Sequence, residues 1–156
     1  MGQQELEQAF ELIAEHADEA DFVGVRPESL ISDAERALGV EFPPTYRSFV
    51  RRFGAGDLFG EEIYGVIDGD FDRPAVPNGT WITHKRREES GLPEGMIVVA
   101  ALGEGSDVVL DTAARGQDGE APVLVWTPGA SSPDDDLEVL AADFGEWLLQ
   151  VLREAA

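Results

Sequence analysis

The segment LGVEFPPTYRSFVRRFGAG, residues 38–56, constrains the fold more than any other part of the chain. Proline is tolerated in the first turn of a helix, where its missing N–H would have no partner, so Pro43-Pro44 predicts a helix start. Glycine just beyond a helix readily adopts the left-handed conformation, so Gly39 is expected to end the preceding helix. Gly54 is expected to end the new helix in turn. The segment therefore predicts two consecutive helices with a tight connection.

Each of these two helices has one apolar face. The first is expected to run from about Glu28 to Leu38, with apolar side chains at the spacing of one helical face. In the second, the side chains at positions i, i+3, i+4 and i+7 are expected to be buried: Tyr46, Phe49, Val50 and Phe53. The outer face of the second helix carries its polar side chains: Arg47, Ser48, Arg51 and Arg52.

The rest of the chain supplies further helices and several strands. Residues 3–20 have the spacing of an amphipathic helix, with carboxylates and no lysine or arginine on the polar face. The strand candidates are rich in β-branched and aromatic residues: Leu58–Ile67, bent at Gly60, then Met96–Leu102, Val108–Asp111 and Val123–Trp126. A loop of Asp, Gly and Pro is expected over residues 68–79, and a weaker pattern over residues 80–90 fits a short helix.

The chain is expected to end in a helix whose apolar face contains Phe144, Trp147, Leu148, Val151 and Leu152. Asp143 is expected to cap the start of this helix, with Glu146 three residues on completing a capping box. Helices, strands and a last helix follow one another without regular strand–helix alternation, which predicts an α+β fold. We expect a single domain over residues 1–156, with an antiparallel sheet of about four to five strands packed with helices from both ends of the chain.

The charge balance is strongly negative, with 32 Asp+Glu against 11 Lys+Arg and a formal net charge of -21. Such a chain repels the phosphate backbone on which nucleic-acid affinity mostly depends, so direct nucleic-acid binding is not expected. A negative field attracts a basic partner and speeds its association. The same composition also serves solubility or reflects a host with an acidic proteome, so composition alone leaves both interpretations open.

The chain has no cysteine, which excludes disulfides and thiolate metal sites. The N-terminal residues lack the basic residues and the unbroken apolar stretch of a secretion signal. The longest apolar run, Met96–Leu102, is too short to span a membrane. We therefore expect a cytoplasmic protein without a membrane segment.

Motifs for catalysis, cofactors and metals are missing from the sequence. There is no G-x-S-x-G elbow, no phosphate-binding loop and no dinucleotide fingerprint. The two histidines, His16 and His84, lack a paired ligand at helical spacing, so both are expected in ordinary surface roles. DGDFD, residues 68–72, resembles the start of a calcium loop, but the positions of its glycine and glutamate hold Arg73 and Gly79. No catalytic residue, cofactor or metal site is expected.

One run of residues resembles the signature of the SUKH superfamily, in the branch named for fungal cell-wall-assembly regulators. The resemblance rests on Ile31, Glu35, Leu38, Gly39, Phe42, Pro43, Tyr46, Phe49, Gly54, Gly56, Phe59, Gly60, Ile63 and Tyr64. Phe42 stands where the family commonly has leucine, and Gly54-Ala55-Gly56 stands where it commonly has asparagine-glycine-glycine. The later segments GEGSDVVLDT, PVLVW and FGEWLLQVL are similar to the family at lower specificity.

The resemblance implies an α+β domain without catalytic activity. In bacteria it implies an immunity protein that neutralises a toxin domain, often a nuclease or deaminase. Most signature residues have packing or backbone reasons and are expected to be structural: Leu38, Gly39, Pro43, Tyr46, Phe49, Gly54, Gly56 and Tyr64. Glu35 fits a capping box with Ser32 if the helix starts late, or else it pairs with Arg47 or Arg51 on the next helix.

Family resemblance and net charge together predict an immunity protein whose acidic surface docks on a cognate protein toxin, expected to be basic. The candidate contacts are carboxylates that flank the first predicted strand: Asp57, Glu61, Glu62, Asp68, Asp70 and Asp72. Apolar or aromatic anchors are still needed for affinity, because exposed charge pairs mainly set rate and specificity. The alternative is a non-catalytic regulatory or scaffold module with an endogenous protein partner. The sequence leaves the oligomeric state open.

Overall fold

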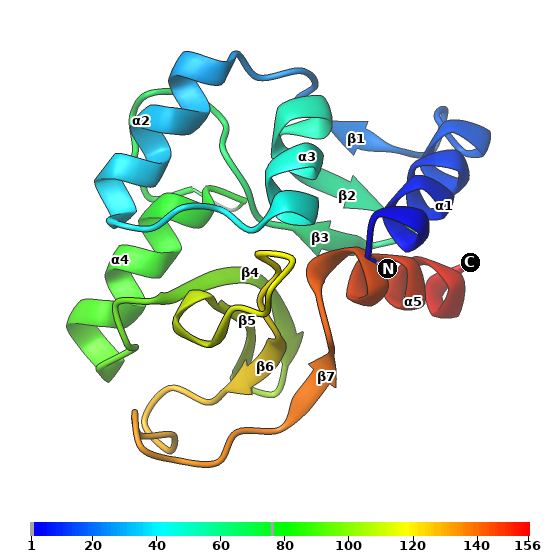
Figure 1. The fold of residues 1–156 in the computed structure, drawn as a ribbon. Helices are drawn as coiled ribbons and strands as arrows, with labels where there is room; N and C mark the ends of the chain where they lie inside the picture. The colour runs from blue at the N-terminus through cyan, green and yellow to red at the C-terminus, as the bar shows by residue number, and fades with distance from the viewer. Residues whose placement is uncertain (1, 76) are drawn as a thin grey trace.

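The structure, a computed structural model, describes residues 2–75 and 77–156. In chain order the helices and strands are α1 (Gly2–Glu15), β1 (Asp21–Phe22), α2 (Glu28–Leu38), α3 (Pro44–Phe53), β2 (Gly56–Leu58), β3 (Glu61–Ile63), α4 (Gly79–Ser90), β4 (Met96–Gly103), β5 (Ser106–Asp111), the short 3-10 helix η1 (Thr112–Ala114), β6 (Val123–Trp126), β7 (Val139–Ala141) and α5 (Phe144–Ala155). Helices and antiparallel strands alternate irregularly (Figure 1), which confirms the predicted α+β class.

The strands form two antiparallel sheets, one of three strands in the order β1-β2-β3 and one of four in the order β4-β5-β6-β7. The sequence predicted a single sheet of about four to five strands. The two sheets are linked where the chain leaves β3, because the Tyr64 N–H donates to the Val99 carbonyl over 2.7 Å. Val99 lies at an irregularity in the pairing of β4 with β5.

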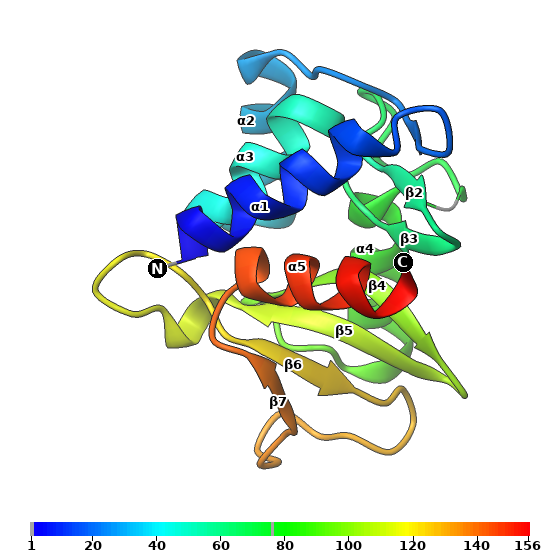
Figure 2. The ribbon, with the colours of Figure 1, turned by 90° about the vertical axis from the view of Figure 1, so that its right-hand side faces the viewer.

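Helices cover both faces of the four-stranded sheet. Val108 and Leu110 of β5 face the larger core, which contains residues of α1, α2, α3 and α5. Val109 between them faces a smaller core under α4. Figure 2 shows α5 lying between α1 and the sheet. Because both faces are buried, the central strands have the continuous apolar runs seen in the sequence rather than strict alternation.

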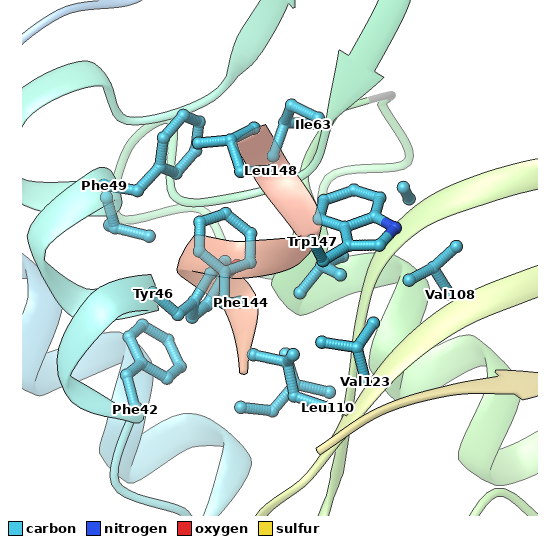
Figure 3. Close-up of a cluster of buried hydrophobic side chains, with 14 of the residues drawn as sticks. Phe42, Tyr46, Phe49, Ile63, Val108, Leu110, Val123, Phe144, Trp147 and Leu148 are labelled. Atoms are coloured by element: carbon cyan, nitrogen blue, oxygen red, sulfur yellow. The ribbon is translucent and has the colours of Figure 1, made fainter. Parts of the chain in front are cut away.

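The larger core is centred on aromatic side chains of α3 and α5 (Figure 3). The Tyr46 and Phe144 ring centroids lie 5.0 Å apart in an edge-to-face arrangement, and those of Phe49 and Phe144 lie 5.4 Å apart. Trp147 extends the cluster along α5. All four side chains are buried, which confirms the centres of the predicted apolar faces of both helices. Phe53 and Val151, at the margins of these faces, are only partly buried.

The first helix is shorter than predicted, because α1 ends at Glu15 and not near Ala20. No basic residue lies in its last turn, where the helix dipole favours positive charge. Asp18 and Glu19 follow instead, and a longer helix would place their negative charges at the negative end of its dipole. The chain turns there and enters β1, a strand that the sequence did not predict.

The predicted strand over residues 58–67 was also wrong, because it is split into β2 and β3 by a tight turn. Phe59 and Gly60 both have positive φ, 57° and 79°, at the centre of this turn. The chain therefore reverses fully at Gly60, where only a bend was expected. The next helix, α4, forms over the residues of the weaker pattern, and Asn78 caps it through the Trp81 N–H.

Candidate partner-binding surface

Three carboxylates lie directly opposite one another across the three-stranded sheet. Asp21 of β1 is in register with Asp57 of β2, and Asp57 is in register with Glu62 of β3. Residues paired in this way project from the same face, with Cβ atoms about 4.5–5.5 Å apart. We call Asp21, Asp57 and Glu62 the acidic row. Like charges placed directly opposite destabilise a sheet, so this arrangement costs folding free energy.

No basic side chain that the structure describes neutralises the acidic row. Among residues 2–75 and 77–156, none of the three carboxylates takes part in an ion pair. Partial burial and the neighbouring charge of Asp57 raise the pKa of Glu62. Asp21 and Glu62 are exposed and Asp57 is half-buried, so a partner can reach the row.

The other predicted contact residues have different neighbours. Glu61 is exposed next to the turn and lies opposite Leu58 in the pairing of β2 with β3. Asp68 and Asp70 lie on the loop after β3, where the Asp68 carboxylate accepts the Asp70 N–H over 2.9 Å and pairs with Arg73. The structure thus brings Asp57 and Glu62 together in one row, whereas the loop carboxylates form a second group.

Asp72 is the third carboxylate of the loop, and its side chain is 91% exposed with an oxygen 3.7 Å from His84 Nδ1. The other ring nitrogen of His84 lies 3.0 Å from the Ala37 carbonyl, near the end of α2. Arg87 donates to the Leu38 carbonyl one residue later, over 2.9 Å. Basic side chains at the C-terminal end of a helix stabilise it, so His84 has a structural role in joining α4 to α2.

Asp21 is the member of the acidic row that sequence reasoning missed. The one signal available was composition, because DFVGV, residues 21–25, contains the aromatic and β-branched residues common in strands but is too short to show a period. Even with that strand predicted, the register that places Asp21 beside Asp57 depends on a contact between segments far apart in the chain.

The described residues contain neither a cluster of metal ligands nor a helix that could cross a membrane. In residues 2–75 and 77–156, no three His, Asp or Glu side chains are arranged to hold a metal ion. No helix in this part of the chain combines the length and the apolar character needed to cross a bilayer.

A sequence model of the SUKH_6 family, described as SMI1-KNR4 cell-wall, matches residues 28–148. The chain belongs to the SUKH superfamily. This superfamily includes toxin-immunity proteins. The match begins at the first residue of α2 and ends within α5, so Asp57 and Glu62 lie inside it and Asp21 lies before it.

The SUKH signature residue Glu35 holds the connection between α2 and α3. Its carboxylate accepts the Phe42 N–H over 2.7 Å, and its other oxygen lies 3.5 Å from Arg47 Nε. Because α2 already begins at Glu28, the capping box with Ser32 is wrong and the pairing with Arg47 is correct.

The arginines on the outer face of α3 are engaged within the SUKH domain. Arg47 donates to Glu28 over 2.6 Å, and Arg51 lies 3.6 Å from the same carboxylate. The hydrogen bond from Arg47 is the main cause that lowers the pKa of Glu28. Arg52 instead stacks over the Phe10 ring, 5.1 Å from its centroid.

The SUKH signature glycines and tyrosines have structural roles: the glycines permit close approaches or left-handed turns of the backbone, and the tyrosines link elements of the core. Gly54 has a φ of 73°, and a Cβ there would lie 3.1 Å from the Val66 carbonyl oxygen. The buried Tyr46 hydroxyl donates to the Tyr64 carbonyl over 2.9 Å, and burial raises the pKa of Tyr46. Gly39 adopts the left-handed conformation after α2 as predicted, with a φ of 71°. Gly54 and Tyr46 thus connect α3 to the segment that follows β3.

A buried carboxylate that no sequence pattern predicted caps α3. Pro43 precedes this helix and has no side-chain oxygen, so the Thr45 N–H needs another partner. Glu120, only 7% exposed, supplies it: one oxygen accepts this N–H over 3.1 Å and the other accepts the Thr45 hydroxyl over 2.9 Å. The hydroxyl oxygen in turn accepts the Gly145 N–H of α5. Glu120 therefore joins the first turns of two helices.

Replacement of Glu120 by glutamine is expected to raise the free energy of unfolding at neutral pH. Burial is the main cause of the raised pKa of Glu120, and the charges of Asp143 and Asp118 also raise it. The folded state therefore binds this proton more tightly than the unfolded chain, and wild-type stability rises as the pH falls through the raised pKa towards the ordinary carboxyl value. Glutamine can accept the Thr45 N–H through its one side-chain oxygen and donate from its NH2 group to the Thr45 hydroxyl oxygen, but it does not titrate. Its advantage should therefore shrink over that pH window in urea unfolding experiments.

Glu120→Ala is the control for this prediction. It removes the cap of α3 and is expected to lower the free energy of unfolding by about 1–2 kcal/mol. A difference between Glu120→Gln and wild type that stays constant with pH would contradict the role given to burial of this carboxylate.

Proposed function

We propose that this SUKH domain is a cytoplasmic immunity protein that binds and neutralises a basic toxin, such as a nuclease or another toxin that modifies nucleic acid. It acts by binding and not by catalysis. The observation that supports this most directly is the acidic row, whose charge the chain leaves unpaired at a cost in folding free energy. Membership of a superfamily that includes toxin-immunity proteins supplies the second argument.

The acidic row suits the cleft of a protein that binds nucleic acid. Such clefts hold phosphates with Lys and Arg side chains. A guanidinium or ammonium group placed between the carboxylates of Asp57 and Glu62 would relieve their mutual repulsion and gain charge-assisted hydrogen bonds. The domain would then occupy the phosphate sites of the toxin without being a substrate. The remaining negative charge of the chain would steer the encounter.

Reversal of charge beside the acidic row tests this proposal. The double variant Glu61→Lys and Glu62→Lys is expected to slow association with the toxin domain encoded beside its gene by about tenfold or more at low salt. The salt dependence of the association rate should fall as well, because fewer favourable charge pairs remain. Stopped-flow measurements over a range of salt concentrations give both quantities.

A matched control is the double variant Asp134→Lys and Asp136→Lys, on an exposed loop before β7. It changes the net charge by the same amount at another place. If both double variants slowed association equally, only the overall charge would matter, and the placement on the sheet would be wrong. Unchanged kinetics for Glu61→Lys and Glu62→Lys would also rule out this placement.

The second candidate function is a regulatory or scaffold module with an endogenous protein partner. The cell-wall description of the matching family favours it. The absence of a toxin gene beside the gene for this chain, together with specific binding of a protein from the same cell that persists at high salt, would favour this function over immunity.

A further inference from the structure

A hollow with a mainly apolar lining lies beside β1. It has a volume of about 340 Å³ and is bounded by the end of α1, by β1 and the residues after it, and by the end of α3. Figure 1 shows β1 between α3 and the end of α1. The lining side chains that matter here are Ala14, Ala17, Phe22, Val25 and Phe53. We call this feature the β1 hollow.

Exposed aliphatic side chains are concentrated around the β1 hollow. Val25 on its rim is 71% exposed, and Val23 two residues earlier is 41% exposed. Ala14 and Ala17 of the lining are also exposed. Single exposed apolar residues are ordinary, but a contiguous group at a hollow is typical of an interaction site.

Carboxylates border the β1 hollow on the side of α1. A second hollow, of about 290 Å³, adjoins it and shares Ala14 and Arg52 in its lining, to which it adds Glu7 and Glu11. Within the described residues no carboxylate of α1 forms an ion pair. Arg52 is the one cation among the described residues that line the two hollows, and it lies over the Phe10 and Phe53 rings, 5.1 and 5.5 Å from their centroids. Arg26, next to Val25, donates to the backbone carbonyls of Val23, Val25 and Ile67.

The charge around the β1 hollow selects its occupant. A second copy of this chain carries a net charge of -21 and the same carboxylates, so the two copies repel each other. We infer that the β1 hollow binds an aliphatic or aromatic side chain of a basic protein partner, with flanking Lys or Arg side chains placed against Glu7 and Glu11. This inference rests on the proposed function, because it names the apolar anchor of the same partner class.

Strand β1 connects the two surfaces. Asp21 belongs to the acidic row, and the adjacent residue, Phe22, lines the β1 hollow. Successive residues of a strand project from opposite faces, so a partner that wraps the edge of β1 can contact both. The row would then govern the association rate, while the buried apolar anchor would govern the lifetime of the complex.

Short synthetic peptides provide a direct test with the whole protein. The first has one phenylalanine flanked by lysines, the second replaces that phenylalanine by serine, and the third replaces the lysines by glutamates. The phenylalanine–lysine peptide is expected to bind about tenfold or more tightly than the serine–lysine peptide, because it buries an aromatic ring. In NMR titrations it should shift the backbone amides of Ala14, Ala17 and Val25 at low and high salt. The glutamate peptide should not bind.

Val25→Asn is the matching variant, since an exposed side chain can be changed with little effect on folding. It should remove the advantage of phenylalanine over serine and leave binding of the serine–lysine peptide unchanged. Val139→Asn is its control, because Val139 is also an exposed valine, 63% exposed, on β7. This control should bind every peptide as the wild type does.

Three results would overturn the inference. They are equal binding of the phenylalanine and serine peptides, shifts confined to residues away from the β1 hollow, and a dimer in sedimentation experiments that Val25→Asn dissociates. With the cognate toxin, a complex lifetime unchanged by Val25→Asn but an association slowed by Glu61→Lys and Glu62→Lys would reject the hollow and keep the proposed function. Peptide binding at the hollow without any binding of the toxin would reject the proposed function alone.

Discussion

Phe49→Ala is expected to lower the free energy of unfolding by about 3–5 kcal/mol, the range for removal of a buried phenylalanine. The Phe49 side chain of α3 is 0% exposed and contacts Phe144 of α5 and Phe22 of β1. Its ring centroid is 5.4 Å from that of Phe144 and 5.9 Å from that of Phe22. Alanine would leave a cavity between three elements that cannot all move inward. The variant therefore loses the free energy of burying the ring and also pays the cost of the cavity. Urea unfolding measures the change.

Phe53→Ala is the control for this prediction. Phe53 belongs to the same helix but is only partly buried, so its loss should cost less than that of Phe49. Equal losses for the two variants, or a loss below about 1 kcal/mol for Phe49→Ala, would contradict the central place given to Phe49 in the core.

Gly56→Ala is expected to lower the free energy of unfolding by roughly 2–5 kcal/mol, through backbone strain and overpacking together. Gly56 has a φ of 152°, and a Cβ there would lie 2.6 Å from the Phe22 Cα and overlap the Asp21 carbonyl oxygen. Both contacts are with backbone, which cannot rotate away. The variant would push β1 from β2 and disrupt the acidic row, so association with a basic toxin should slow as well.

Gly60→Ala is the matched control in the same hairpin. Gly60 also has a positive φ, 79°, but a Cβ there would meet nothing within 4 Å. Its cost should therefore be conformational only, about 1–2 kcal/mol. Thermal unfolding of both variants separates the two contributions, and equal losses would contradict a close approach of β1 at Gly56.

Much of the fold follows from residues that are near one another in the sequence. Pro43-Pro44, Gly39 and Gly54 bound their helices where the sequence predicted, because a fixed φ and a left-handed φ act within one or two residues. The Asp143 cap of α5 is likewise local, and its carboxylate accepts the Glu146 N–H over 2.9 Å. Strands β1 and β7 were missed because two or three residues carry no periodic signal.

The candidate site was predictable only in part. Composition indicated an acidic surface, and Asp57 and Glu62 were selected as carboxylates that flank the first predicted strand. Nothing in the sequence placed their side chains opposite each other, because the predicted strand only bends at Gly60 and continues to Ile67. The turn at Phe59 and Gly60 places Asp57 and Glu62 opposite each other, and the pairing of β1 with β2 adds Asp21 to the same row.

Net charge, the boundaries of α2 and α3 and family membership were readable from the chain alone, since each is a sum over composition or a pattern among near neighbours. The acidic row, the β1 hollow and the cap of α3 by Glu120 arise from contacts between distant segments, 75 residues apart in the case of Thr45 and Glu120. Such contacts depend on strand register and helix packing, in which every element of the core takes part. Only the folded chain shows which of its many carboxylates lie together without an ion pair to a described basic side chain.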